Sequence, residues 1–376
     1  MTLYLDWAAT APVEPAAVAA MGDAARAWAN PSSVHGPGRA AAAMLADARA
    51  AVAAALGCAP GAVVFTGGGT EALHLGLAQG DAHLISAVEH DAVRAQVPRA
   101  RVIPVDRDGV VDLAALDRLL AAAPVPPLVA VMHVNNETGV IQPVAEVARL
   151  VAGRGLLLVD AVQSAGKLPL PAADFVTVSA HKLGGPPGVG ALICRGPVAA
   201  ATRGGGQERG QRAGTENLPG IVGFAAALTA RMADAGWVER VAALCDRLES
   251  QLAGAVVHGA GAPRLGTISC IGLHGVAAMT QLMTLDIAGF AVSAGAACSS
   301  GKVRTSHVLG AMGVDATGAG QAVRVSLGWT TTAADVDAFA AAWTAMADRL
   351  GADRLGAAGR PGADRLGAAR PGRAAA

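Results

Sequence analysis

Four short segments of this sequence carry side chains that could do chemistry. The first is a turn of three glycines, residues 67–69, followed by Thr70 and Glu71 and placed between an apolar run and a helical pattern. Such a turn leaves backbone N–H groups open at the start of a helix, where the helix dipole favours an anion. The segment could therefore cradle a phosphate, although similar turns are common without any anion. It is not the G-x-G-x-x-G pattern of dinucleotide-binding proteins.

The second segment ends an apolar run, Leu156–Val159, on the carboxylate of Asp160. A carboxylate in this position is costly to bury unless a cation accompanies it. The protonated nitrogen of a pyridine ring would be such a cation. For this segment taken alone, an aspartate that caps the following helix is the better interpretation.

The third segment places Lys182 directly after the apolar run Phe175–Ser179 and before a glycine-rich turn. Crowding there could lower the pKa of the amine, and lysines of this kind form Schiff bases with aldehydes. An ordinary surface lysine is the commoner case for any single lysine. Lys167 is the only other lysine between the glycine turn and this point, which narrows the choice of a lysine that could form a Schiff base.

The fourth segment surrounds Cys298 with small residues, from Ser293 to Gly301. This composition predicts a mobile loop that exposes the sulfur, and Lys302 and Arg304 could favour its thiolate form. A cysteine is more often a small buried hydrophobe. That interpretation suits three other cysteines, which lie in predicted strands and a predicted helix: Cys194, Cys245 and Cys270.

The elements that must position these side chains alternate between strand-like and helix-like patterns from about residue 16 to 240. The alternation predicts a largely parallel sheet covered on both faces. Open sheets of that type bind ligands beyond the carboxyl ends of their strands, where Asp160 and Lys182 would lie. The predicted strands are Ala62–Thr66, His83–Ser86, Leu128–His133, Leu156–Asp160, Phe175–Ser179 and Gly190–Cys194.

The remaining sequence predicts a smaller α+β unit, with helices at Val238–Leu252 and Ala333–Leu350 and a strand at Gly266–Cys270. Beyond Leu350 the chain repeats a phrase rich in Gly, Arg and Pro, which indicates a disordered low-complexity tail. The expected domains are a large one at 13–235, a small one at 1–12 and 236–350, and the tail at 351–376.

The overall composition excludes several function classes. Lys plus Arg and Asp plus Glu are equal at 29 each, so no net field attracts a nucleic acid. The sequence has no stretch of about 18 uninterrupted apolar residues, so we expect no membrane span. The N-terminus lacks the basic region of a secretory signal. The five cysteines are odd in number and lack C-x-x-C spacing. We therefore expect no disulfide framework and no metal site, and a cytoplasmic location.

Together with further phrases in the same order, these segments resemble the class V aminotransferase family, specifically the cysteine desulfurases of the NifS and IscS type. The resemblance covers essentially residues 3–345. The matching phrases begin with 5–6 and 8–10, 30–35, 68–71, Glu89-His90, 132–139 and 160–163, and continue with 179–183, 204–209, 212–217, the Cys298 loop and 324–328.

The resemblance implies an α/β protein of the PLP-dependent transferase type I fold. Its large domain would hold a mostly parallel seven-stranded sheet, with a small α+β domain beside it. The protein would be a homodimer with sites at the subunit interface. The implied cofactor is pyridoxal 5'-phosphate (PLP), with Lys182 as the lysine that bears it and Asp160 as the partner of its ring nitrogen.

The resemblance also implies roles for the other site residues. His90 would stack on the cofactor ring and help to move protons, and Gln163 would contact the phenolic oxygen. Asn136 and Arg324 would grip the substrate carboxylate, with Asn136 also against the cofactor. The phosphate would be held by Gly69, Thr70, Ser179 and His181, joined by Thr215 of the partner subunit.

The implied activity converts L-cysteine to L-alanine through a PLP aldimine, with the released Lys182 amine as base. The sulfur would pass through a Cys298 persulfide to an acceptor protein, such as an iron–sulfur scaffold, for iron–sulfur cluster or thio-cofactor assembly. Two alternatives stay open. One is a related PLP lyase or aminotransferase, such as a selenocysteine lyase, and the other is a non-catalytic sulfur-carrier partner. No nucleic acid or membrane partner is implied.

Several positions depart from the family pattern. Trp7 stands where an Asn is common, Leu73-His74 replaces a frequent Asp-Asn pair, Gly184 replaces a common Tyr, and Pro187 a common Lys. None of these changes removes a reacting group, so they bear on rate and partner choice more than on reaction class.

Overall fold

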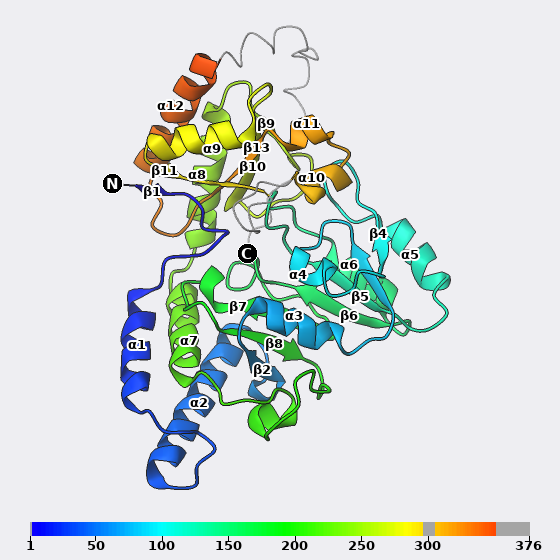
Figure 1. The fold of residues 1–376 in the computed structure, drawn as a ribbon, viewed down its shortest axis with the longest axis vertical. Helices are drawn as coiled ribbons and strands as arrows, with labels where there is room; N and C mark the ends of the chain where they lie inside the picture. The colour runs from blue at the N-terminus through cyan, green and yellow to red at the C-terminus, as the bar shows by residue number, and fades with distance from the viewer. Residues whose placement is uncertain (1, 296–304, 351–376) are drawn as a thin grey trace.

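The computed structural model describes residues 2–295 and 305–350, which form two main sheets with their helices (Figure 1). Cys298 and the tail at 351–376 lie outside the described residues. The large sheet has seven strands in the order β2-β8-β7-β6-β5-β3-β4. These are β2 (Val63–Thr66), β3 (His83–Ser86), β4 (Arg101–Ile103), β5 (Leu128–Met132), β6 (Leu156–Asp160), β7 (Phe175–Ser179) and β8 (Gly190–Cys194).

The expectation of a mostly parallel seven-stranded sheet is confirmed. Only β8 runs against its neighbours β2 and β7, and all other pairs are parallel. Met132, Asp160 and Thr177 are aligned in register across β5, β6 and β7. The carboxyl ends of these parallel strands therefore meet at one edge of the sheet, as expected for a ligand-binding edge.

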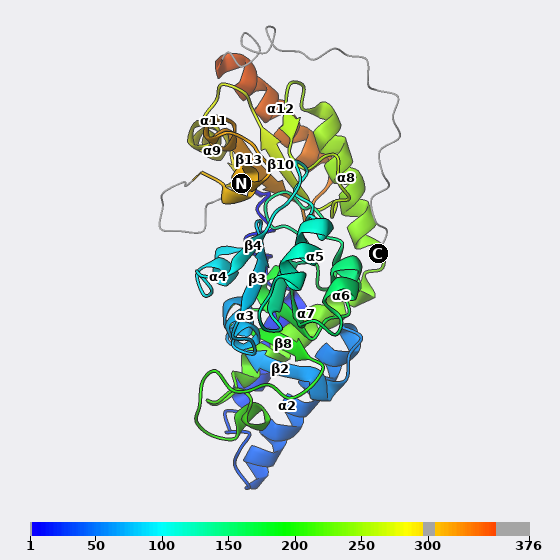
Figure 2. The same ribbon diagram turned by 90° about the vertical axis from the view of Figure 1, so that its right-hand side faces the viewer.

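Helices cover both faces of the large sheet, because its strands are apolar on both sides. In β5, Leu128 and Ala130 pack on one side while Val129 and Val131 pack on the other. Figure 2 shows α3 (Gly69–Leu77) and α6 (Val144–Val151) on opposite sides of this sheet. The first side also holds α4 (Asp91–Arg94), and the second holds α2 (Gly36–Ala55), α5 (Leu113–Ala121) and α7 (Leu218–Ala233), with α1 (Pro15–Arg26) against α7.

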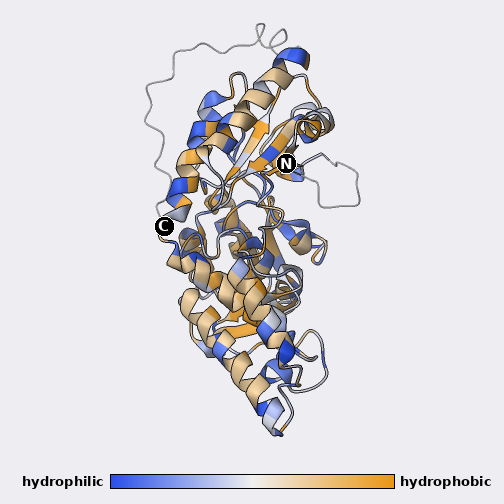
Figure 3. Ribbon diagram, turned by 90° about the vertical axis from the view of Figure 1, so that its left-hand side faces the viewer, coloured by the Kyte–Doolittle hydropathy of each residue, from blue (hydrophilic) through white to orange (hydrophobic). Residues whose placement is uncertain are grey.

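The second sheet is antiparallel and has four strands in the order β12-β13-β10-β9. Its strands are β9 (Val256–Val257), β10 (Ile268–Gly272), β12 (Ser293–Ala294) and β13 (Ala322–Ser326). Its helices are α8 (Trp237–Gln251), α9 (Ala278–Ile287), α10 (His307–Ala311), α11 (Ala316–Ala319) and α12 (Ala333–Leu350). Figure 3 shows apolar strands inside and polar helix faces outside in this part of the molecule.

The N-terminal segment ties the two parts of the molecule together. Strand β1 (Leu3–Tyr4) pairs with β11 (Phe290–Ala291), and Asp6 forms a bridge with Ser326 of β13. The chain then passes the end of the large sheet and enters α1. Residues 5–10 therefore lie between the four-stranded sheet and the carboxyl edge of the large one.

Helices α7 and α8 follow one another across a sharp bend of 73°. Gly236 precedes α8 with φ of 78°, a conformation that a glycine adopts without strain. In the described part of the chain, no single helix has the length and apolarity needed to cross a membrane, and this bent pair alone meets the length and composition criteria when its two helices are taken together.

Candidate active site at the carboxyl edge of the large sheet

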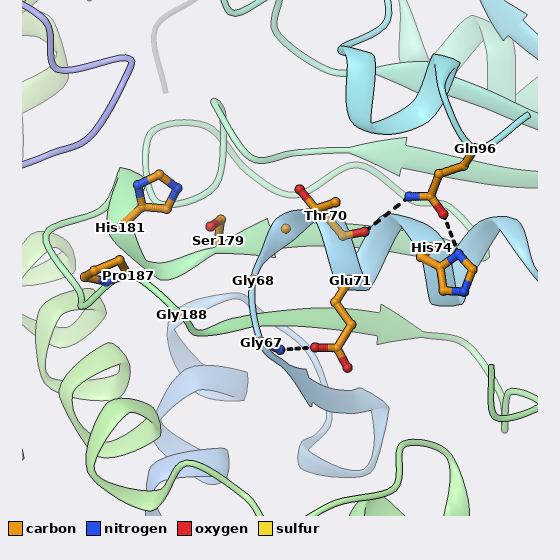
Figure 4. A pocket seen from close by; sticks show the side chains of 11 residues that line it. Gly67, Gly68, Thr70, Glu71, His74, Gln96, Ser179, His181, Pro187 and Gly188 are labelled. Carbon is orange, nitrogen blue, oxygen red and sulfur yellow. Dashed lines mark hydrogen bonds between the residues drawn. The ribbon is translucent and has the colours of Figure 1, made fainter. Parts of the chain in front are cut away.

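A cavity of about 670 Å³ opens where α3 begins, beside the ends of β2 and β7 (Figure 4). Its residues come from the glycine turn, from α3, from the segment after α4, and from the end of β7 and the segment that follows it. They are Gly67, Gly68, Gly69, Thr70, Glu71, His74, Gln96, Ser179, His181, Pro187 and Gly188. Of the residues expected to hold a phosphate, Gly69, Thr70, Ser179 and His181 thus line one cavity.

The glycine turn is held in place by its own hydrogen bonds. The Thr66 hydroxyl donates to the carbonyl oxygen of Gly68 at 2.9 Å, and the N–H of Gly67 donates to Glu71 at 2.5 Å. Arg212 pairs with the same carboxylate at 2.7 Å. Burial raises the pKa of Glu71, but the bonds from Arg212 and Gly67 outweigh it, so the pKa is lowered. Glu71 thus stays ionised and fixes the turn.

Gly69 packs so closely on Val162 and the end of β7 that a larger residue would be crowded. An added Cβ would lie 3.0 Å from Val162 and 3.4 Å from the Cβ of Ser179. Gly69 is also the first residue of α3, and the first N–H groups of a helix have no acceptor within it. The floor of the cavity therefore combines helix N–H groups with the Ser179 side chain, a suitable set of donors for an anion.

Lys182 is positioned by the turn of 3-10 helix, Ala180–Lys182, that follows β7. Its amine donates to the carbonyl oxygens of Ala8 and Ala9, at 2.8 and 2.6 Å. The N-terminal segment therefore sets the position of the amine. Lys182 does not line the cavity at the glycine turn, but it follows directly on Ser179 and His181, which do.

Asp160 ends β6 and is 7% exposed. Burial raises its pKa, the hydrogen bond from the N–H of Val162 at 2.9 Å lowers it, and so do the charges of His90 and Lys182. The cap interpretation is thus partly right, since the carboxylate accepts a bond from the turn that follows. The charges of His90 and Lys182 also act on this carboxylate. Because burial still raises its pKa, a further cation nearby would stabilise its ionised form.

Gln163 lies beside Lys182 on the same carbonyl group. Its Nε2 donates to the carbonyl oxygen of Ala8 at 2.9 Å, as Lys182 does. Its Oε1 atom is buried and has no hydrogen-bond partner among the described residues. A buried amide oxygen without a partner is costly, so Gln163 has capacity for a ligand.

His90 is the N-cap of α4, and its Nδ1 accepts from the N–H of Ala92 at 3.1 Å. The adjacent Glu89 is fully buried and receives bonds from Ser86 at 2.5 Å and from the N–H of Met132 at 2.7 Å. Burial, with a smaller contribution from the charge of Asp160, raises the pKa of Glu89 to about 8. Glu89 was part of the Glu89-His90 motif, but the sequence predicted no role for it.

His181 lines the cavity as a neutral imidazole and not as a cation. Its Nδ1 lies 3.2 Å from the Thr10 hydroxyl, and burial together with the charge of Lys182 lowers its pKa to about 4. The imidazole is therefore neutral at physiological pH and can offer one N–H group to a ligand in the cavity.

Arg324 lies on β13 with only 4% of its side chain exposed. It donates to Asp6 at 2.8 Å and to the carbonyl oxygen of Asn136 at 2.9 Å. Its Nε is buried without a hydrogen-bond partner in the described segments. Arg324 and Asn136, both expected to bind the substrate carboxylate, are therefore in direct contact, and Asp6 orients the guanidinium.

Thr215 is placed differently from the other expected phosphate ligands. It lies in the exposed segment before α7 and does not line the cavity of its own chain. The remaining predicted residue, Cys298, belongs to 296–304 and lies outside the described residues.

Trp7 and Gly184, two of the positions that depart from the family pattern, both pack against Trp329. Trp7 packs edge-on against Trp329, with ring centroids 4.6 Å apart, and Trp329 packs in the same way on Trp237. Gly184 has φ of 82°, and an added Cβ would lie 3.0 Å from the Trp329 ring. The small residue at 184 therefore makes room for the indole of Trp329.

Comparison with known proteins places these features in a family. The profile of the family "Aminotransferase class-V" matches residues 3–339. A cysteine desulfurase of Cereibacter sphaeroides is 42% identical over 363 residues, covering 89% of this chain and 93% of that protein. An IscS-like cysteine desulfurase of Mycobacterium tuberculosis is 39% identical over 89% of this chain and 93% of its own. The X-ray structure of a NifS-like protein from Rickettsia africae superposes with a TM-score of 0.86 at 32% identity, covering 93% of this chain and all of that one.

Proposed function

Since the chain belongs to the class V aminotransferase family, we infer that it is a PLP-dependent cysteine desulfurase, which takes sulfur from L-cysteine and leaves L-alanine. The observation that carries the inference is the meeting of Lys182, Asp160 and His90 at the carboxyl edge of the large sheet, next to the glycine-turn cavity. The cysteine desulfurases of Cereibacter and Mycobacterium cover nearly the same length of chain.

The cavity suits the phosphate of pyridoxal phosphate. We propose that the N–H groups at Gly69 and Thr70 bind it, with Ser179 and the neutral His181. The support is the close packing of Gly69 on Ser179, which brings the start of α3 next to this side chain, and the alignment of the α3 dipole with a negative charge.

We propose that Asp160, Gln163 and His90 surround the ring of the cofactor. A buried carboxylate whose pKa is raised would gain from a cationic ring nitrogen, and the partnerless Oε1 of Gln163 supports a nearby polar ligand group. When bound, pyridoxal phosphate withdraws electrons from the carbon that carries the substrate amine. We propose that Asp160 keeps the ring nitrogen protonated, that His90 packs on the ring and helps to move protons, and that Lys182 carries the cofactor.

The substrate carboxylate would bind at Arg324 and Asn136. Asp6 and the carbonyl oxygen of Asn136 hold two nitrogens of the guanidinium, while its Nε lacks a partner in the described part of the chain. An arginine fixed in this way is suited to a carboxylate. The Lys182 amine, held at the carbonyl oxygens of Ala8 and Ala9, would take up the proton from the α-carbon of the substrate.

For the sulfur step we propose Cys298, on the basis of its sequence context. Its thiolate would attack the sulfur of the substrate, forming an S–S bond as the C–S bond breaks. The electron pair of the broken bond stays with the carbon fragment, which takes up a proton and leaves as alanine. The persulfide would then pass its outer sulfur to an acceptor protein, and an iron–sulfur scaffold is the acceptor class we propose.

We further propose that two copies of the chain complete each other's sites. Thr215 is exposed and lies away from the cavity of its own chain, and Trp28 and Val34 are 83% and 88% exposed. These features support a homodimer in which the partner subunit's Thr215 joins the phosphate site. In the described part of the chain Cys58, Cys194 and Cys270 are free thiols, which supports a reducing, cytoplasmic setting.

The test is the release of alanine and sulfide from L-cysteine by the purified holoprotein, in the presence of a thiol reductant. Replacing Cys298 by Ala should abolish sulfide release, and replacing the half-buried Cys58 by Ala should leave it unchanged. Full activity in the Cys298 variant would refute the thiol role. No alanine from wild-type protein that binds pyridoxal phosphate would refute the desulfurase assignment.

A further inference from the structure

A second cavity, of about 660 Å³, lies at the bend between α7 and α8, away from the glycine turn. It is bounded by the end of α2, by the turn at residues 166–170 that follows β6, and by residues 231–239. Figure 1 shows α2 and α7 side by side below the point where α8 begins. The cavity therefore has one wall on the large sheet's helices and another on α8, which packs on the small sheet.

Most of the lining of this cavity is apolar. Leu168 and Trp237 belong to the hydrophobic cluster of the small sheet, while Ala55 and Leu170 pack against the cluster of the large sheet. An apolar cavity of this size can take up the body of a small organic ligand.

Lys167 lines the apolar cavity and is only 8% exposed. No hydrogen bond or ion pair joins its amine to any residue within 2–295 or 305–350. Burial, followed by the charge of Lys182, lowers the pKa of Lys167 to about 7. A buried ammonium without a partner is unfavourable, so an anion in this cavity would stabilise it.

The second cation at this cavity, Arg231, is already occupied. It pairs with Glu14 at 2.7 Å, lies 3.6 Å from Asp234, and stacks at 4.1 Å on the ring of Trp329. Its Nε and Nη1 atoms are buried and make no hydrogen bond to a described residue, but the charge of the guanidinium is already matched by the carboxylate of Glu14. Among the described residues at this cavity, Lys167 is thus the cation whose charge no carboxylate matches, since Asp234 is paired with Arg240 at 3.0 Å.

From this arrangement we propose that the α7–α8 cavity binds a monocarboxylate with an apolar body, whose carboxylate pairs with Lys167 while its hydrocarbon part lies along Leu168, Leu170 and Trp237. A single negative charge is matched to a single available ammonium. Phosphate esters and other polyanions are disfavoured, because a single ammonium matches only one of their charges and the carboxylate of Glu239 would repel the rest.

A ligand bound in this cavity would contact both the large-sheet part and the small-sheet part of the molecule. The ligand would contact the segment that follows β6 and also Trp237 at the start of α8. The charge of Lys167 acts on Lys182 as well, since the two amines interact electrostatically. A bound carboxylate would therefore change the field at Lys182 without occupying the site at the carboxyl edge.

The test is titration calorimetry of the holoprotein with octanoate. At pH 8.5 the free Lys167 amine is mostly neutral, and pairing with a carboxylate raises its pKa. Binding should therefore take up about one proton per octanoate, measured from the heats in two buffers of different ionisation enthalpy. Lys167→Met, which keeps the side-chain length, should weaken octanoate binding at least tenfold and abolish proton uptake. Arg149→Met, on the exposed surface of α6, is the matched control and should change neither.

Three outcomes would overturn the proposal. These are the absence of saturable octanoate binding to wild type, equal binding to the Lys167→Met variant, and binding of 1-octanol as tight as that of octanoate.

A second measurement does not depend on the folding of a variant. Octanoate should slow acetylation of Lys167 by acetic anhydride at least tenfold at pH 7.5, followed by mass spectrometry, and unchanged acetylation would also overturn the proposal.

Discussion

Two lysines lie close enough to interact electrostatically, yet their surroundings differ in kind. Lys182 follows β7 at the carboxyl edge of the sheet, where two carbonyl oxygens receive its amine and Asp160 lies within electrostatic range. Lys167 lies in the turn after β6, in an apolar cavity, with no partner among the described residues.

The difference shows that burial alone does not make a lysine catalytic. The amine of Lys182 is aimed by the N-terminal segment and is next to groups that can handle protons and charge. The amine of Lys167 has a lowered pKa, which is often taken as a sign of an active site, but among the described residues no hydrogen bond orients it, and most of its cavity lining is apolar. We therefore assign covalent chemistry to Lys182 and ion pairing to Lys167.

The largest effect expected from this comparison separates the two lysines by substitution. Lys182→Ala should lower the rate of alanine formation at least ~1,000-fold, because it removes the group that bears the cofactor and takes up the proton. Lys167→Met should stay within about twofold of wild type, a barrier change below about 0.5 kcal/mol. The measurement is the steady-state rate with L-cysteine. A loss of comparable size in both variants would break the distinction.

Asp160 should be the next most sensitive position. Asp160→Asn removes the charge that would stabilise a protonated ring nitrogen, and removing one preorganised electrostatic group from an active site costs about 2.7–4 kcal/mol. We expect kcat to fall roughly 100- to 1,000-fold. Asp174→Asn is the matched control, since Asp174 receives the N–H of Leu157 at the opposite end of β6. If the two variants lose the same activity, Asp160 acts only through the stability of the strand.

Two buried arginines, Arg324 and Arg231, differ in the same way as the two lysines: one lies at the proposed active site and the other at the second cavity. Asp6 orients Arg324 near the carboxyl edge, and Glu14 pairs with Arg231 at the second cavity. Asp6→Asn should raise the KM for L-cysteine about tenfold with a smaller change in kcat, because a charge-assisted bond contributes about 1.5–3 kcal/mol. Glu14→Gln should lower the free energy of unfolding and leave KM unchanged. A raised KM in the Glu14 variant alone would contradict the assignment of Arg324.

The last prediction concerns stability and not rate, and it is a dependence of the free energy of unfolding on pH. The pKa of Lys167 is about 7 in the folded protein and about 10.4 in an unfolded chain. Between these values the unfolded chain binds more protons, so Lys167 makes stability rise with pH, by at most about 1.4 kcal/mol per pH unit. Urea unfolding at pH 7 and pH 9 should show a smaller rise in Lys167→Met than in wild type. Parallel changes would contradict the lowered pKa.

The parts of the fold that could be predicted from the sequence are those with continuous apolar runs. Leu156–Asp160 and Phe175–Ser179 are strands with the predicted bounds, and their register places Asp160 beside Thr177. β4 was missed because it lies at the sheet edge, where Arg101 and Val102 are exposed. An edge strand with one buried residue has no apolar run to reveal it.

The parts of the site that could not be predicted depend on contacts between distant residues. Glu89 is fully buried through bonds from Ser86 and Met132, and nothing in the local sequence of a glutamate indicates burial. Lys167 was noted in the sequence only as a competitor of Lys182. Its burial results from the packing of α2, α7 and α8, which lie far apart along the chain.

The central claim is that Lys182, and not another amine, carries the cofactor. The chain has only three lysines, at 167, 182 and 302, so the claim can be read from one experiment. The holoprotein is reduced with borohydride, digested, and searched by mass spectrometry for peptides that carry the reduced cofactor. The account predicts the added mass on Lys182 alone. The same mass on Lys167 or Lys302, or on none of the three, would contradict it.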